Sequence, residues 1–301
     1  NPNLLINNIE NILANHPAVK FIDDSICRIE GVKSIQSFIG EKGHRYQGDT
    51  FVLATGATIS KILDNSELNL DIQQVFYGVG VSIEVKTNEF IHQKTIRTPV
   101  RGGGCGIYTV PYYKGVNQPK DHMLIGASNY VSTEPDYNGR LISLNHLMHS
   151  ATNQINMNFY DARFIKQNVG LRPISYDGYM LMGETKFKNL YVVSGTKRDG
   201  FHMSPVISEE ITNQIISNKV NKKFKLFQPE RKPIHNLTRS QSVKQIVNNL
   251  ISEQFQHEFN PSNIKMLNQL KQKYEDDINK IHDNLGATDW GIPVHMINMF
   301  K

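Results

Sequence analysis

The sequence predicts an α/β protein with a helical C-terminal part, and three stretches indicate this fold class. Residues 190–194 form a short apolar run, a glycine-bounded loop spans 195–201, and a helix is expected from about Met203. A strand, a loop and a helix in this order present backbone N–H groups to an anionic or electron-rich group. Residues 75–85 alternate as in a strand, whereas 264–285 repeat apolar residues at helical spacing.

Composition limits the classes of protein that fit. The 301 residues, 39% of them hydrophobic and 20% charged, suffice for one large or two medium domains with a proper core. No run of about 18 apolar residues occurs, so we expect no membrane span. The chain starts at Asn1 without a secretory signal, which indicates a processed product or a piece of a longer protein, located in the cytoplasm.

The cysteines and the charge distribution argue against a disulfide-rich, a metal-binding or a nucleic-acid-binding protein. Cys27 and Cys105 make no disulfide framework and have no neighbouring ligands at metal-site spacing, so we expect reduced thiols and no metal. The net charge is +5, with one basic cluster between 222 and 232. Because no basic face with interleaved aromatic residues occurs, no nucleic-acid partner is expected.

The N-terminal residues predict a helix followed by short strands. Apolar residues recur at helical spacing over 4–15, with Asn3 as a candidate cap and Pro17 as a stop. Strands are expected at 18–22, 25–29, 34–39 and 44–46, the last two as a hairpin, and at 49–57, which ends in small residues.

The rest of the chain predicts a sheet and then helices. Expected elements are a short helix within 60–70, strands at 75–85, 107–111 and 123–129, and helices at 141–159, after Pro205, at 243–257 and at 264–285, the last ended by Gly286. The glycine run 102–106 lacks the Lys-Ser/Thr of a phosphate loop and opens no helix, so it predicts a flexible loop. Residues 221–237 read as a linker, and the apolar tail 290–295 is expected to dock.

Arg172 is the main candidate for binding a substrate. It lies in the apolar run 169–173, and its planar guanidinium can hold both oxygens of a carboxylate. The alternative is a structural salt bridge to Asp177 or Glu184.

The segments GLRP (170–173), DG (177–178), NLYVVSG (189–195), GF (200–201) and SP (204–205), in this order, resemble the C-terminal signature of FAD-dependent amine and amino-acid oxidoreductases. The glycine oxidase and D-amino-acid oxidase type is the most similar. The resemblance covers about residues 1–216 and implies an antiparallel substrate sheet inserted in a Rossmann-type FAD-binding domain that is incomplete here. It divides the chain into three parts. Residues 1–66 and 166–220 would form the remainder of the FAD-binding domain, residues 67–165 the substrate domain, and residues 221–301 a linker and a helical extension.

The resemblance also implies roles for individual residues. Arg172 would bind the substrate carboxylate and Tyr108 would position the substrate, although a structural strand tyrosine is an equal alternative; Asn129 is a weaker candidate for the pocket wall. The implied FAD-contacting residues are Ile26, Ala54, Thr55, Gly56, Arg198, Asp199, Gly200, Phe201, His202 and Met203. His202 has a surface position as its alternative. Thr196 stands where the family often has His.

The implied reaction is hydride transfer from the substrate Cα to flavin, followed by hydrolysis of the imine. The family's Gly-x-Gly-x-x-Gly unit for the ADP half of FAD is absent from the sequence. A preceding segment or a second chain would supply it, or the chain would be an inactive interaction module. Removal of a carboxymethyl group from a tRNA base is a further alternative, which the weak basic character does not favour. The electron acceptor, the substrate and the role of 221–301 stay open.

Overall fold

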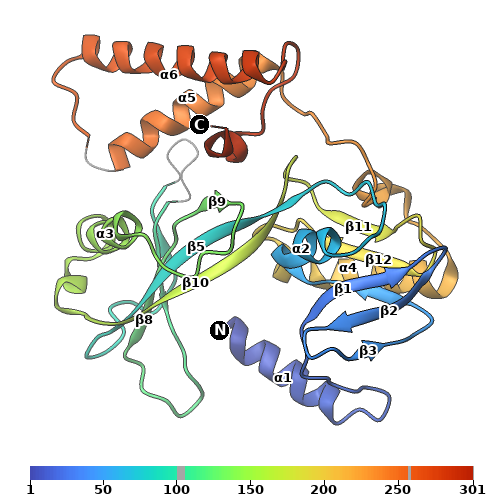
Figure 1. Ribbon diagram of the computed structural model, residues 1–301. Helices are drawn as coiled ribbons and strands as arrows, with labels where there is room; N and C mark the ends of the chain where they lie inside the picture. The colour runs from blue at the N-terminus through green and yellow to red at the C-terminus, as the bar shows by residue number, and fades with distance from the viewer. Residues whose placement is uncertain (100–105, 257–258, 301) are drawn as a thin grey trace.

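The computed structural model describes residues 1–99, 106–256 and 259–300, so most of the glycine run and Cys105 lie outside the described residues. The described residues form three sheets and a C-terminal helical layer (Figure 1). An antiparallel sheet joins β1 (Ile26–Gly31), β2 (Ile35–Gly40) and β3 (Arg45–Tyr46). A second sheet has the order β11-β12-β4, from Leu181–Glu184, Leu190–Ser194 and Phe51–Leu53.

The β11-β12-β4 sheet is the part with Rossmann-like features. Strand β4 runs parallel to β12 although the two are far apart in sequence. A 3₁₀ turn (Gly56–Thr58) and helix α2 (Ile59–Asp64) follow β4, and helix α4 (Gly200–Ser217) follows β12. The apolar residues of both small sheets and α2 share one core, in which Leu53, Ile59 and Leu190 are buried.

The largest sheet has the order β10-β5-β8-β7-β6, and β9 also pairs with β5. Its strands are β5 (Val75–Lys86), β6 (Ile96–Arg97), β7 (Tyr108–Pro111), β8 (His122–Gly126), β9 (Tyr130–Ser132) and β10 (Arg163–Ser175). Long antiparallel pairing of β10 with β5 aligns Arg172 with Gly78 and Gly170 with Gly80. Helix α3 (Leu141–Ser150) packs Leu147 on this sheet.

The C-terminal extension, residues 221–300, contains a 3₁₀ helix (Lys222–Phe227), α5 (Arg239–Gln256), α6 (Ile264–Asn284) and a last 3₁₀ helix, η5 (Val294–Met299). It lies beside one end of the largest sheet (Figure 1). Ile246, Ile278 and Ile292 of the extension form one apolar cluster with Phe76 and Ile174 of the sheet. The predicted docking of the tail is confirmed, because Ile292 and Ile297 are buried in this cluster.

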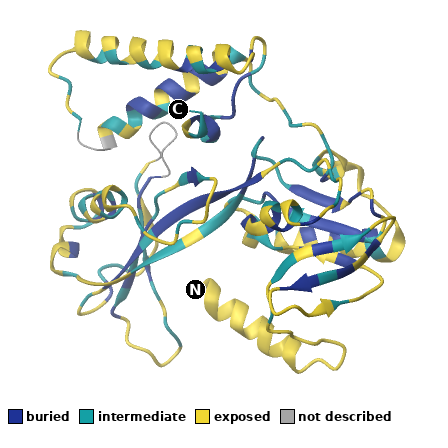
Figure 2. Cartoon of the chain, viewed as in Figure 1, coloured by how far each residue is buried: buried dark blue, intermediate teal, exposed yellow. Residues whose placement is uncertain are grey.

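The first helix, α1 (Pro2–Ala14), agrees with the predicted amphipathic helix but packs differently from a core helix. None of its residues is buried, and the whole helix is exposed in Figure 2. Its cap is Asn1, whose side chain accepts from the N–H of Asn3, so the choice of Asn3 as the cap was wrong.

Two other expectations were wrong. Residues 18–22 form no strand: they pair with no described strand, and Val19, Phe21 and Ile22 are exposed. The helix expected over 141–159 ends earlier, because a π-helical turn (Ala151–Ile155) follows α3 and Asn156 is extended. A 3₁₀ helix (Met157–Asp161) then restores the burial of Phe159.

Candidate functional site

Two adjoining cavities lie where the largest sheet meets the loop after β12. The first, here called the loop cavity, has a volume of about 580 Å³. The second, the extension cavity, has about 470 Å³ and lies under the C-terminal extension. Both are lined by Ala127, Ser128, Arg172, Lys197 and Arg198. Five of the residues assigned from the sequence, Tyr108, Arg172, Arg198, Gly200 and Phe201, therefore meet at one cavity.

Arg172 comes from β10, and its guanidinium lies against the backbone of Gly80 on β5. A Cβ atom at Gly80 would overlap the guanidinium, so the glycine leaves the space that the arginine uses. The Nη1 atom of Arg172 donates to Oδ1 of Asn129 at 3.1 Å. The salt bridge at Asp177 is made by Arg231.

Tyr108 comes from β7, and its ring lies over Gly126 of the neighbouring strand β8 in the same way. A side chain at Gly126 would overlap the phenol ring and its hydroxyl group. Glycines on β5 and β8 thus let an arginine and a tyrosine lie flat on the sheet beside one cavity. This arrangement suits recognition of a carboxylate by a guanidinium and a phenol.

The loop between β12 and α4 closes the other side of the loop cavity. Lys197 has a left-handed backbone, with φ of 50°, and its N–H donates to the carbonyl of Pro173 at 2.9 Å. Burial lowers the pKa of the Lys197 ammonium, and nearby Asp177 opposes this shift. Helix α4 then starts at Gly200 without a side-chain cap and without an acidic residue in its first turn. Its first N–H groups suit a partly negative ligand atom.

Not all assigned residues reach this cavity. Asp199, His202 and Met203 are near it in sequence but do not line it: Asp199 and His202 are exposed, and Met203 packs against the core under α4. Ile26 packs on β1 against the core of the small sheets.

The end of β4 is a second surface that fits a cofactor. Ala54 is exposed, and Oγ1 of Thr55 is buried without a hydrogen-bond partner in the described chain. Gly56, with φ of 62°, has open space where a side chain would stand, and its carbonyl accepts from the hydroxyl of Ser194 at 2.8 Å. An orphaned hydroxyl beside an open glycine fits the approach of a polar ligand.

The Asp177–Arg231 pair ties the C-terminal extension to this region. The two side chains are 1% and 10% exposed. Burial raises the pKa of Asp177, but hydrogen bonds from Arg231, the N–H groups of Ile234 and Tyr179, and Gln73 outweigh it and lower the pKa below the usual value. Asp177, one of the two acidic residues considered as a structural partner of Arg172, is thus ion-paired with Arg231.

His295 of η5 also borders the extension cavity. Burial and the neighbouring Lys197 lower its pKa to about 4, against weaker opposing effects of Asp177 and of backbone hydrogen bonds with Ser175 and Tyr176. Its Nε2 atom is buried and has no hydrogen-bond partner within the described part of the chain. The ring is therefore neutral at pH 7.

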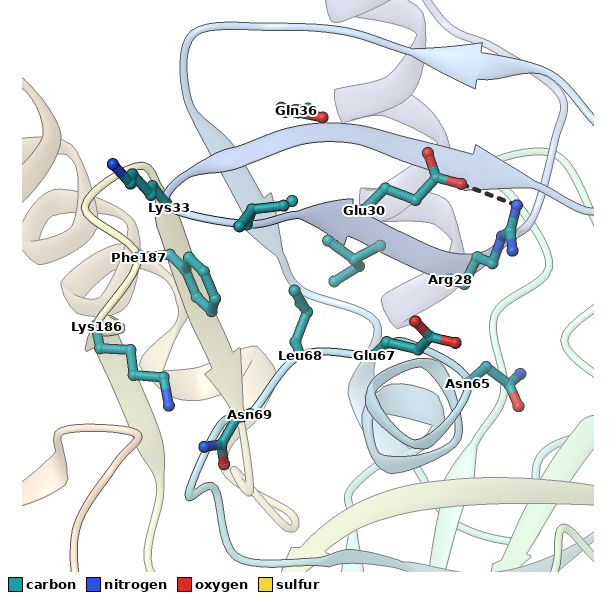
Figure 3. Close-up of a pocket in the computed structure, with 13 residues that line it drawn as sticks. Arg28, Glu30, Lys33, Gln36, Asn65, Glu67, Leu68, Asn69, Lys186 and Phe187 are labelled. Carbon is teal, nitrogen blue, oxygen red and sulfur yellow. Dashed lines mark ion pairs between the residues drawn. The ribbon is translucent and has the colours of Figure 1, made fainter.

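A larger cavity, of about 840 Å³, is bordered by β1, by the segment after α2 and by the turn between β11 and β12 (Figure 3). It is lined by mixed charges, among them Lys33, Glu67 and Lys186, and by the ion pair of Arg28 with Glu30 at 2.9 Å. It contains none of the residues assigned from the sequence, so size alone does not identify the site. Among the described residues, no cluster of potential metal ligands occurs, and no helix is long and apolar enough to cross a membrane.

Sequence reasoning missed several residues at the two cavities. Ser128 and Arg97 line the loop cavity, and Gly80 and Gly126 make room for its main side chains. For Gly80 and Gly126, the available signal was a glycine inside a predicted strand, which often marks a place where another group lies close to the backbone. No comparable signal marked His295, about 120 residues after Arg172 in the sequence.

Comparison with known proteins identifies the protein family to which the chain belongs. The family described as DAO, FAD dependent oxidoreductase, matches residues 11–214, and the chain belongs to this family. The match includes β4, Tyr108, Arg172 and the start of α4, and it ends before the C-terminal extension. Among curated proteins, no sequence matches the chain.

Solved structures have the same fold. Glycine oxidase from Geobacillus kaustophilus is 20% identical with a TM-score of 0.57, over 70% of this chain and 53% of that one. Iminodiacetate oxidase from Chelativorans sp. BNC1 is 15% identical with a TM-score of 0.57, over 69% and 53%. A fructosyl peptide oxidase mutant is 14% identical with a TM-score of 0.61, over 75% and 57%. The chain thus spans about half the length of these structures.

Proposed function

We propose that this chain is the substrate-binding and flavin-facing part of an enzyme that oxidises an amine or amino acid with FAD. The observation that carries the proposal is the meeting of Arg172 and Tyr108 with the start of α4 at one cavity. Membership in a family of FAD-dependent oxidoreductases supports the choice of cofactor. Bound FAD would accept the hydride that leaves the substrate Cα, and the imine product would be hydrolysed by water.

The residues of the chain have separate roles in this proposal. Arg172, positioned by Gly80 and Asn129, binds the substrate carboxylate through two N–H groups. Tyr108 donates its hydroxyl to the carboxylate or orients the amine. Arg198, Gly200 and Phe201 would hold the flavin, and the first N–H groups of α4 would stabilise negative charge on it. Asp199, His202 and Met203 lie at the start of the same helix.

The residues at the end of β4 would face the cofactor as well. Ala54, Thr55 and Gly56 form an open surface with an orphaned hydroxyl. In this proposal, 1–66 and 166–220 belong to the FAD-binding domain and 67–165 to the substrate domain.

The proposal requires a source for the ADP-binding half of the cofactor site. A preceding segment or a second chain would bring it, and the exposed apolar residues of α1, such as Ile9 and Ile12, offer a face for it. The free thiol of Cys27 is compatible with the cytoplasm as the proposed compartment. An inactive interaction module is the alternative.

The test uses the full-length protein and the variant Arg172→Ala. The wild-type protein should contain FAD, and anaerobic addition of a suitable amino acid should bleach the flavin absorption. Arg172→Ala should keep its FAD but raise the apparent KM about 30-fold or more, because the carboxylate loses its charged partner. Arg163→Ala, at the exposed start of the same strand, is the matched control and should behave as wild type. A colourless full-length protein that takes up no FAD would refute the proposal.

A further inference from the structure

The C-terminal extension forms one wall of the extension cavity. Ile246, Asn249, Leu250 and Glu253 of α5 line it, together with residues of η5. Their spacing of three, four and seven residues places them on one face of the helix. Residues 221–300 lie beyond the part of the chain that matches the family, so this wall is a feature of this protein rather than of the family match.

The wall is held firmly against the sheet. Ile246 is fully buried and Leu250 is 8% exposed, and both belong to the apolar cluster that includes Phe76, Val131 and Ile174 of the sheet. Close-packed clusters of this kind hold side chains in fixed positions. The shape of the cavity is therefore set jointly by the sheet and by α5.

Arg172 lines both cavities, so a carboxylate bound there leaves the rest of the ligand facing α5 or the loop. The apolar residues at the extension cavity, Ile246, Leu250 and Ile297, are only 0%, 8% and 4% exposed. Its polar lining includes the amide groups of Asn249 and Asn298 and the charged side chains of Arg140 and Glu253. Its volume of about 470 Å³ is in the range of sites that hold ligands much larger than glycine.

We propose that the C-terminal extension selects the substrate, and that the substrate is an amino acid with an extended substituent rather than glycine. The carboxylate lies at Arg172, and the substituent lies along the face of α5 formed by Ile246, Asn249 and Leu250. This inference rests on the proposed function, because it assumes that Arg172 holds a carboxylate.

The test compares two carboxylates by calorimetry on the full-length flavoprotein: acetate, which carries only the carboxylate group, and 4-methylpentanoate, which adds the side chain of leucine. Each buried CH₂ group strengthens binding up to about fourfold, so 4-methylpentanoate should bind about tenfold more tightly or better. Asn249→Phe fills the cavity, and the preference should then fall to about twofold or less. Acetate should bind both proteins equally.

The control is Asn248→Phe. Asn248 is the next residue on the same helix, but it is exposed and faces α6 instead of the cavity. It should keep the wild-type preference. Asn298→Phe, from η5, fills the cavity from a second element and serves if Asn249→Phe does not fold.

Kinetics give a second measurement. Anaerobic flavin reduction by leucine should be faster than by glycine, and Asn249→Phe should reverse or remove this difference. If flavin reduction is normal but neither cavity-filling variant changes the ligand preference, the inference is overturned while the proposed function stands. If no amino acid reduces the flavin, the proposed function itself fails.

Discussion

Acid should weaken the attachment of the C-terminal extension through His295. Burial and Lys197 lower the pKa of this histidine from 6.5 to about 4. Between these two values the unfolded chain binds a proton that the folded chain does not bind. The free energy of unfolding therefore rises with pH across this window, is at its full value above about pH 6.5, and falls as the pH drops towards 4.

The size of the effect follows from the shift. One pKa unit corresponds to about 1.36 kcal/mol. From pH 6.5 down to about pH 5, the unfolded histidine is protonated and the folded one stays neutral, which removes about 2 kcal/mol of stability. The pKa of about 4 already contains the opposing effects of Asp177 and of the backbone hydrogen bonds with Ser175 and Tyr176, which raise the pKa of His295.

The assay is urea unfolding at about pH 5 and about pH 7.5, followed by the fluorescence of Trp290, the one tryptophan of the sequence. Trp290 packs against the apolar cluster of the extension. The variant His295→Gln should lose about 2 kcal/mol of the pH dependence. His16→Gln, an exposed histidine at the end of α1, should keep it. An unchanged pH dependence in His295→Gln would refute the reasoning.

Two further substitutions test the packing behind the site. Gly80→Ala should displace the Arg172 guanidinium, and the apparent KM for a carboxylate substrate should rise about tenfold or more while the FAD content changes little. The control is Gly48→Ala, which should have no effect because a Cβ atom at Gly48 would make only ordinary contacts. Asp177→Asn breaks the buried pair with Arg231 and should cost about 3–5 kcal/mol in urea unfolding. Because the pKa of Asp177 is lowered, its carboxylate is charged at both about pH 5 and about pH 8, so the loss of stability should be the same at the two pH values. If Asp177→Asn were as stable as the wild-type protein at either pH, a stabilising Asp177–Arg231 pair would be refuted.

Local patterns predicted much of the fold. The apolar run 190–194 is β12 as expected, and the long alternating run 75–85 is β5. Such patterns are readable because side-chain periodicity is a property of the strand or helix itself. The same reasoning failed at 18–22, where apolar residues alone did not produce a strand, since a strand also needs a partner for its hydrogen bonds.

The candidate site was predicted only in part. Tyr108 and Arg172 were chosen from short motifs, and the structure brings both to the loop cavity. Asp177, one of the two structural partners considered for Arg172, pairs with Arg231, which lies 54 residues further along the sequence. Pairings over such separations leave no local trace.

The sequence by itself determined the family, the order of strands and helices around residues 170–205, and the residue types available for chemistry. The tertiary structure decided which of them meet: Gly80 under Arg172, Gly126 under Tyr108, and α5 as the wall of the extension cavity. The physical reason is that motifs record the chemistry of neighbouring residues. A cavity, by contrast, forms where strands and helices from distant parts of the chain pack without filling the space between them.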